Sequence, residues 1–194
     1  MYELPVSLSV NGLDHPIRNK GDYRMVLDCF NALNDLELQK QDRIVACLTI
    51  FLEEITDIKD VYNLPDLEEI VKQMMLFFNC GQEETGKKTN YKLIDWQKDE
   101  TLICSAINKV AGKEVRFEPY IHWWTFMGYY MAVGESALST VVSIRSKQSR
   151  NKKLEKNERQ FVADNPQYFN WDRRTAEQIE EDEFLHSLWN ADKK

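Results

Sequence analysis

Few residues in this chain have the chemistry of a catalytic centre, and they are scattered. The three histidines, His15, His122 and His186, are more than sixty residues apart. Glu118 and His122 are four positions apart, so on a helix they would share a face and could form a carboxylate-oriented general base. The alternatives are a salt bridge on the helix surface, or a histidine bonded to a backbone carbonyl at a helix junction. The sequence has no nucleophile elbow, phosphate-binding loop, dinucleotide fingerprint or zinc-protease motif, so we expect no enzyme.

The four cysteines predict reduced thiols and no metal site. They are Cys29, Cys47, Cys80 and Cys104, separated by 18, 33 and 24 residues, and each falls in or at the end of an apolar helical pattern. No C-x-x-C pair is present, which disfavours zinc and redox roles. The first residues lack a basic region followed by an apolar run, so we expect no secretory signal and a cytoplasmic location.

A second group with possible chemistry is aromatic and lies in the uncharged stretch from 119 to 134. The adjacent Trp123 and Trp124 could stack on a base or sugar, but apolar neighbours on every side favour a core position. Pro119 suits the first turn of a helix and Gly134 its end. We therefore predict a central helix over 119–134, too short to span a membrane. The predicted core residues of this stretch are Tyr120, His122, Trp123, Trp124 and Phe126.

The elements around this stretch predict a mainly α protein. Residues 6–17 alternate around Asn11-Gly12, a strong turn signal, and predict a β-hairpin. Apolar residues at helical spacing predict the remaining helices, at about 22–33, 39–54, 65–81, 95–112, 135–147, 154–163 and 174–189. The polar stretch 82–90 is the one clear internal loop. We predict a compact domain of six or seven helices with an N-terminal hairpin over 1–165, and a helical extension over 166–194.

Charge is distributed unevenly along the chain. The whole protein is acidic, with a net charge of −7, whereas residues 145–159 are strongly basic. The basic side chains are Arg145, Lys147, Arg150, Lys152, Lys153, Lys156 and Arg159. This predicted basic helix could contact phosphates, pair with the acidic residues 180–183, or form a solvated face. The acidic balance of the whole favours the last two over nucleic acid.

The stretch Tyr120-Ile-His-Trp-Trp-Thr-Phe126 resembles the Y-L-H-W-W-x-F signature of a bacteriophage family named for its gene position, gene-product fifteen. The hairpin 10–17, the helix end 77–81 and the Ile94-Asp-Trp96 lead-in agree in order. The pair Ile144-Arg145 with the lysine-rich stretch to Arg159 completes the resemblance, which covers roughly residues 6–165. The H-W-W-x-F part is fairly specific, and the other parts gain weight from their order.

The resemblance implies a protein of the tail gene module of phages or prophages of Gram-positive bacteria. It implies a position like that of tail assembly chaperones, which coat the tape-measure protein while the tail tube polymerises. No activity or cofactor is implied. The alternatives are a structural component of the virion tail and a nucleic-acid-binding module that uses residues 145–159. The seven basic residues of that stretch are the predicted partner-binding side chains.

The apolar side chains of residues 174–189 require a surface, because a helix of this length is marginal alone in water. The basic stretch 145–159 is nearby in sequence and complementary in charge. We therefore predict that the extension folds back on it and shields the surface that binds the partner.

Overall fold

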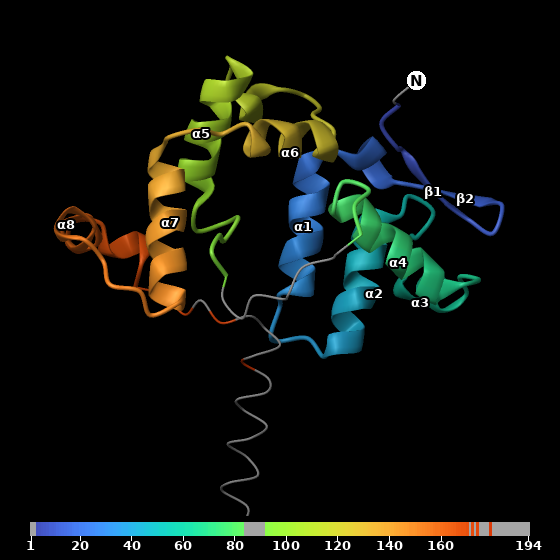
Figure 1. Ribbon diagram of the computed structural model, residues 1–194. Helices are drawn as coiled ribbons and strands as arrows, with labels where there is room; N and C mark the ends of the chain where they lie inside the picture. The colour runs from blue at the N-terminus through green and yellow to red at the C-terminus, as the bar shows by residue number, and fades with distance from the viewer. Residues whose placement is uncertain (1–2, 84–91, 171, 173, 175–178, 180–194) are drawn as a thin grey trace, which may run out of the picture. The chain divides into compact units, whose positions relative to one another are not determined.

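The computed structural model describes residues 3–83, 92–170, 172, 174 and 179, and it is mainly α-helical (Figure 1). Eight α-helices and one two-stranded antiparallel sheet lie in this part of the chain. The predicted fold class is confirmed. The helix that the sequence pattern did not indicate is α3, which is only five residues long.

Two compact units divide the chain. Unit 1 is Met1–Gly86 with Glu114–Ala132, and unit 2 is Lys87–Lys113 with Val133–Lys194. The range predicted as one domain, 1–165, is thus shared between the units. The boundary at 165/166 stays a prediction, because most of 166–194 lies outside the described residues.

The predicted hairpin is present in unit 1. Strand β1 (Ser7–Val10) pairs with β2 (Leu13–Pro16), and Ser7 lies opposite Pro16. Asn11 and Gly12 both have positive φ, 49° and 84°, which the tight hairpin turn requires. The Asn11 side chain donates to Asp66 Oδ2 at 2.8 Å, so the hairpin tip is tied to the start of helix α4.

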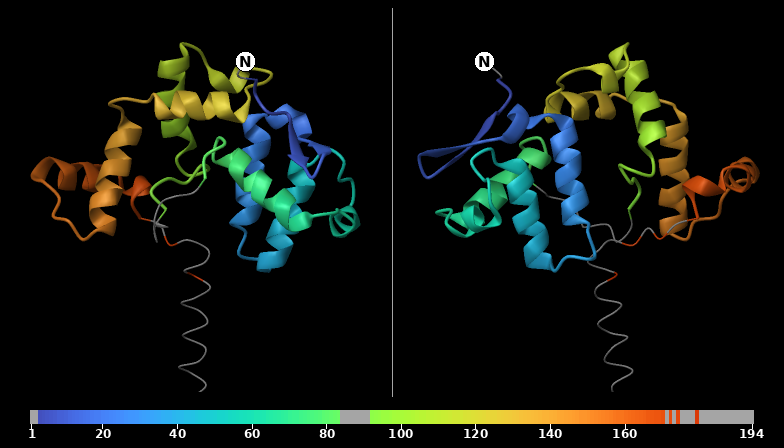
Figure 2. Two further views of the ribbon diagram at one scale, coloured as in Figure 1. Left: turned by 45° about the vertical axis from the view of Figure 1, so that its right-hand side comes forward. Right: turned by 180° about the vertical axis from the view of Figure 1, so that it is seen from behind.

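The helices of unit 1 surround an aromatic centre. They are α1 (Tyr23–Leu33), α2 (Lys40–Phe51), α3 (Ile58–Tyr62), α4 (Leu67–Phe78) and α6 (Trp123–Met131), with 3-10 turns η1 (Arg18–Gly21) and η2 (Val115–Phe117). Helices α1 and α2 lie side by side (Figures 1 and 2). Phe30, Phe51, Phe77, Phe78 and Trp123 meet edge to face in their interior, the arrangement that aromatic quadrupoles favour.

Helix α6 is shorter than predicted at both ends. It begins at Trp123 with His122 as N-cap and ends at Met131, so Pro119 and Gly134 lie outside it. The reason is long-range: the Ile121 N–H donates to Asp22 Oδ2 and the Ile121 carbonyl accepts from Tyr23 N. Bonds to the start of α1 therefore hold this backbone extended, where a longer α6 would need it helical.

Unit 2 contains α5 (Glu100–Ala111), α7 (Ala137–Ser149), α8 (Lys156–Asp164) and the 3-10 turn η3 (Pro166–Tyr168). Apolar residues of α5 and α7, among them Leu102, Ile103, Val141 and Ile144, are buried. The basic stretch 145–159 is not a single basic helix but spans the end of α7 and the start of α8, in line with the predicted helices 135–147 and 154–163. Asn151 adopts a left-handed φ of 53°, and Lys152 N bonds back to Lys147 O at 2.8 Å, which ends α7 in a Schellman turn.

Across the described residues, no helix combines the length and the apolar content needed to cross a bilayer.

Candidate functional site

His122 is a structural residue of unit 1. Its Nδ1 accepts from the Trp124 N–H at 3.0 Å and caps α6, while Nε2 lies 2.9 Å from the Pro5 carbonyl. Because a backbone N–H can only donate, Nδ1 accepts, and the neutral ring donates from Nε2. Burial lowers the pKa of His122, which favours this neutral form. Of the three interpretations of His122, the histidine bonded to a backbone carbonyl is the one present. Glu118 lies outside α6, so the two residues do not share a helical face.

The two tryptophans of the signature bind carbonyls at the C-terminal end of helix α4. The Trp123 Nε1–H donates to the Phe78 carbonyl and the Trp124 Nε1–H to the Phe77 carbonyl, each at 2.9 Å. These are carbonyls of the last turn, which lack helical partners. Trp123 is buried and Trp124 half-buried, so the Trp123 ring is not accessible for stacking on a base or sugar.

Two further signature residues, Phe126 and Tyr120, differ in burial. Phe126 is buried and stacks on Tyr23, with ring centroids 4.2 Å apart. Tyr120 was predicted in the core, and this is wrong: its side chain is 44% exposed. Tyr120 precedes α6 in the extended segment, and its hydroxyl donates to the Lys20 carbonyl at 2.9 Å. The signature is therefore an internal clasp that joins α1, α4 and α6.

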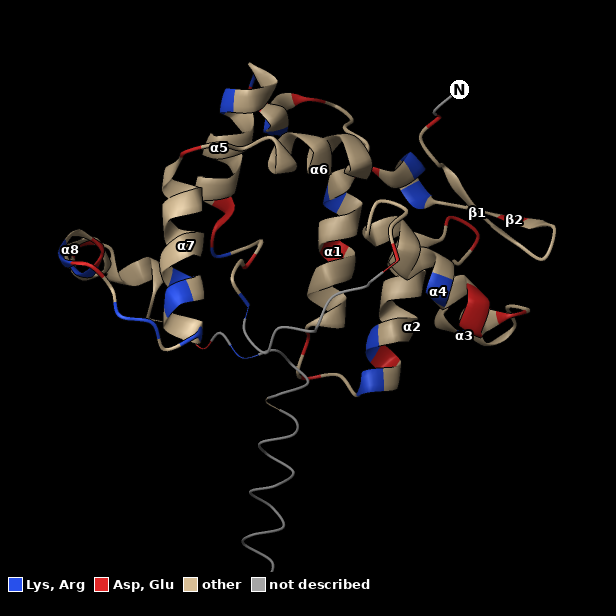
Figure 3. Ribbon diagram, viewed as in Figure 1, with Lys and Arg blue, Asp and Glu red and all other residues tan. Residues whose placement is uncertain are grey.

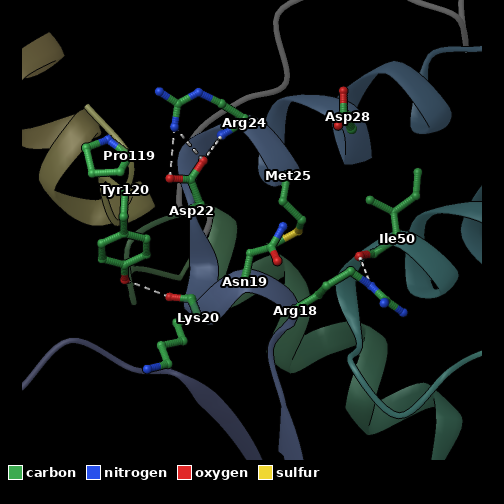
Figure 4. Close-up of a pocket in the computed structure, with 10 residues that line it drawn as sticks. All are labelled: Arg18, Asn19, Lys20, Asp22, Arg24, Met25, Asp28, Ile50, Pro119 and Tyr120. Atoms are coloured by element: carbon green, nitrogen blue, oxygen red, sulfur yellow. Dashed lines mark hydrogen bonds and ion pairs between the residues drawn. The ribbon is translucent and has the colours of Figure 1, made fainter. Parts of the chain in front are cut away.

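Beside this clasp, unit 1 has an open pocket of about 910 Å³ (Figure 4). Its lining residues are Arg18, Asn19, Lys20, Asp22, Arg24, Met25, Asp28, Ile50, Pro119 and Tyr120. Asn19, Lys20 and Gly21 all have left-handed φ, between 50° and 77°, a rare backbone conformation for three successive residues.

The arginines of this pocket already bind the protein itself. Arg24 binds both carboxylate oxygens of Asp22 and the carbonyls of Val115, Arg116 and Glu118. Arg18 donates to four carbonyls at the end of α2 and just beyond it, those of Thr49, Ile50, Leu52 and Ile55. The pocket thus has mixed polar and apolar walls, and both of its guanidinium groups are already bonded within unit 1.

In unit 2, Arg145 is fully buried and is not a partner-binding residue, contrary to prediction. Its guanidinium forms a bidentate ion pair with Asp99, at 2.6 and 2.8 Å, and both side chains are completely inaccessible. The other donors bind the carbonyls of Leu93 and Tyr168. The five N–H groups of Arg145 therefore join α7, the start of α5, the 92–95 lead-in and η3.

The other basic residues lie on the surface of unit 2. Lys147 pairs with Glu158 at 2.5 Å. Basic residues occur in the segment before α8 and on α8 itself (Figure 3). Five of them are exposed, namely Arg150, Lys152, Lys153, Lys156 and Arg159. Their role toward a partner stays a prediction. The acidic residues 180–183 lie outside the described residues.

In the part of the chain that the structure describes, the thiols and carboxylates form no cluster with the chemistry of a reactive centre. None of the four cysteines is in a disulfide, and Cys80 is half-buried whereas the other three are buried. A hydrogen bond with Cys47, together with burial, raises the pKa of Cys29, which opposes a thiolate nucleophile. In the described part of the chain, no cluster of three or more His, Cys, Asp or Glu side chains could hold a metal ion.

Sequence reasoning missed several residues that organise the two units. Asp99 is one such residue, since its partner Arg145 is 46 positions away. Arg24 binds carbonyls more than ninety positions away, and no local spacing indicates such a contact. The exposed pair Ile58 and Tyr62 on α3 was detectable only through the Asp57/Asp60 capping box.

Comparison with known proteins gives one family. No curated protein and no solved structure matches the chain. A family model described as Bacteriophage Gp15 protein matches residues 1–169, which include the H-W-W-x-F signature and end at the buried Phe169. This family suggests a phage structural or tail-related protein. The chain belongs to the bacteriophage Gp15 protein family.

Proposed function

We propose that this protein is a non-catalytic phage tail assembly factor, a tail assembly chaperone that binds the tape-measure protein. Family membership supports a tail-related role. The observation that carries a binding role is the apolar face of α3, where Ile58 is 57% and Tyr62 67% exposed. The side chains of the signature support the absence of catalysis, because their polar atoms are bound within unit 1.

Helix α3, which carries the two exposed side chains, is capped at its N-terminus. Its N-terminus has a complete capping box, in which Asp57 accepts from Lys59 N and Asp60 accepts from Asp57 N. The hydrogen bonds that Asp60 accepts from the backbone N–H groups of Asp57 and Thr56 lower the pKa of Asp60, which favours the charged carboxylate in the cap. Val61 is buried beneath the helix. The exposure of Ile58 and Tyr62 therefore belongs to an ordered surface.

The surface around α3 suits an amphipathic helix. Ile58 and Tyr62 are four positions apart, so they share one side of α3. The hairpin tip, where Leu13 is 53% exposed, is tied by Asn11 to Asp66, which is only four positions beyond the end of α3. Contiguous apolar side chains at a surface mark interaction sites, and a helix docks by inserting apolar anchors of its own between them. A long amphipathic helix is the chemistry expected of a tape-measure protein.

The test is co-expression with the tape-measure protein of the same phage, followed by affinity capture and a binding titration. Replacing Ile58 and Tyr62 together by Ser should weaken binding about tenfold or more, as loss of interface anchors does. The matched control is Lys59→Ser, an exposed polar position on the same helix, which should bind like the parent chain. Circular dichroism verifies folding of each variant. Unchanged binding by the double variant would exclude the α3 face, and no binding by the parent chain would exclude the chaperone role.

The family membership equally supports a second candidate, a structural component of the virion tail. Mass spectrometry of purified virions separates the two roles. A chaperone leaves before the tail is complete and should be absent. Stoichiometric amounts in the virion would favour the structural role.

A further inference from the structure

Helix α8 is incompletely covered by the described residues. No residue of α8 is buried, and its apolar side chains Phe161 and Val162 are half-exposed, as is Leu154 just before it. Its aromatic contact is with Phe169, at 6.3 Å between centroids. An isolated helix of nine residues does not hold together in water, so α8 requires a further apolar surface.

The surface of α8 is also basic. The basic segment (residues 150–159) has five exposed basic side chains and two acidic ones. Glu158 is already used, because it accepts from Lys147 and from Glu155 N. Lys156 and Arg159 are three positions apart on α8 and share a face. A ligand of this surface should therefore combine negative charge with apolar side chains.

The chain itself contains such a ligand close by. The acidic segment (residues 177–189) begins with five acidic side chains within seven positions and continues with four large apolar ones. They are Glu177, Glu180, Glu181, Asp182 and Glu183, followed by Phe184, Leu185, Leu188 and Trp189.

The acidic segment is attached next to the basic one. Phe169 is buried, and its ring lies 6.3 Å from that of Phe161, so the described chain passes beside α8 at this point. Glu177 is only seven positions beyond Asn170, a reach of at most about 25 Å. A tether of this length gives an effective concentration on the order of millimolar, which makes the intramolecular contact favoured over a separate partner.

We propose that the acidic segment 177–189 binds the basic segment 150–159 and the exposed apolar side of α8 within the same chain. The acidic side chains pair with the five exposed cations, and Phe184, Leu185 and their neighbours cover Phe161 and Val162. This contact does not depend on which tail protein binds at α3.

Zero-length carbodiimide cross-linking of the full chain at low protein concentration tests the contact. We expect cross-links within one chain between Lys152, Lys153 or Lys156 and the acidic segment, reduced roughly tenfold by high salt, which screens exposed charges. Changing these three lysines to Glu should abolish them. A matched control is Lys109→Glu, an exposed lysine of α5 in the same unit.

Charge reversal on both sides distinguishes pairing from misfolding. Combining the three Lys→Glu changes with Glu180→Lys, Glu181→Lys and Glu183→Lys should restore the cross-links in reversed order. Amide exchange gives a second readout, since deleting residues 171–194 should speed exchange in α8. The proposal is overturned if cross-links form only between chains, or if α8 exchanges equally with and without residues 171–194. Salt-sensitive DNA binding that is equally strong in the full and the truncated chain would also overturn it and assign the surface to nucleic acid.

Discussion

The two units join their helices with opposite chemistry. In unit 1 the clasp between α4 and α6 is made of neutral groups, since His122, Trp123 and Trp124 donate to or accept from backbone atoms among stacked rings. The charged Asp22 and Arg24 hold only the segment before α6, through backbone groups. In unit 2 the corresponding junction of α5, α7 and η3 depends on a completely buried ion pair, Arg145 with Asp99. In both units, side-chain donors form hydrogen bonds to backbone carbonyls that have no partner within a helix or strand.

The difference lies in the cost of losing one member. Removing a neutral donor leaves one carbonyl unsatisfied, at about 1–3 kcal/mol. Removing one member of a buried ion pair leaves an uncompensated charge, at about 3–5 kcal/mol. Unit 2 should therefore be more sensitive to a polar substitution, and unit 1 to loss of ring volume.

The largest effect is expected for Arg145→Met. This change leaves Asp99 charged and buried and frees the carbonyls of Leu93 and Tyr168, so the free energy of unfolding should fall by about 3–5 kcal/mol. Urea denaturation measures the loss, and amide exchange should rise first in α5 and α7. The control Lys147→Met removes a surface cation and should cost about 1 kcal/mol or less.

A second change distinguishes loss of the pair from loss of one charge. Adding Asp99→Leu to Arg145→Met should recover part of the stability, because apolar replacement of both members is often neutral. If Arg145→Met were no more harmful than Lys147→Met, the ion pair would not hold unit 2 together.

In unit 1, Trp123→Ala should lower the free energy of unfolding by about 3–5 kcal/mol, since the ring is buried. Trp124→Ala should cost less, because that ring is half-buried. Trp123→Phe keeps most of the ring volume and loses the bond to the Phe78 carbonyl, so it isolates the neutral hydrogen bond. Thermal denaturation with exchange of α4 and α6 amides measures all three. Equal losses for Trp123→Ala and Trp124→Ala would contradict their different burial.

A smaller effect is expected for Gly21→Ala. Gly21 has a φ of 77°, and a Cβ there would lie 2.8 Å from Phe77 Cζ and 3.1 Å from His122 Nε2. Overpacking against these rings should cost about 1–3 kcal/mol beyond the backbone strain. Gly12→Ala is the matched control, since Gly12 also has a positive φ, 84°, but no atom lies within 4 Å of its Cβ position. Similar melting temperatures for both variants would show that backbone strain alone accounts for the loss.

The smallest expected effect is a loss of stability at acid pH that depends on His122. The pKa of His122 lies below its ordinary value of 6.5 because of burial, so below about pH 6.5 the unfolded chain takes up a proton that the folded chain does not. Its contribution to stability is complete above that pH and is lost as the pH falls toward the folded pKa, with a slope of at most about 1.4 kcal/mol per pH unit.

Urea midpoints measured between about pH 7.5 and pH 5 should fall less steeply for His122→Asn than for the parent chain. Asparagine keeps an N-cap side chain for α6 but does not titrate. His15 is present in both chains, so the difference between the two slopes reports His122 alone. Parallel slopes would mean that His122 is protonated equally in both states.

The local pattern was sufficient for elements whose signals are local. The Asn11-Gly12 turn and the apolar periodicity of α1, α4 and α5 are all present as predicted. The predicted helix bounds were wrong where side chains distant in sequence bind the backbone atoms that a helix would use. Helix α6 begins four residues later than its proline suggests, because Asp22 binds the Ile121 backbone from 99 positions away.

The candidate site divides in the same way. The exposed cations of 150–159 were identifiable by composition, since a dense basic run is solvated unless something covers it. Arg145 belongs to the same run but is buried, because Asp99 and two carbonyls converge on it from other elements. The sequence identified the residues of the clasp as a family signature. It did not indicate which backbone atoms their side chains bind.

By itself the sequence determined the helical class, the hairpin, the buried tryptophan and the uneven charge, because these follow from side-chain periodicity, turn preference and composition. Only the tertiary structure decided which polar atoms meet: His122 with Pro5, both indoles with the end of α4, and Arg145 with Asp99. Such pairs depend on how segments tens of residues apart come together, and the free energy of satisfying a buried group exceeds any local preference.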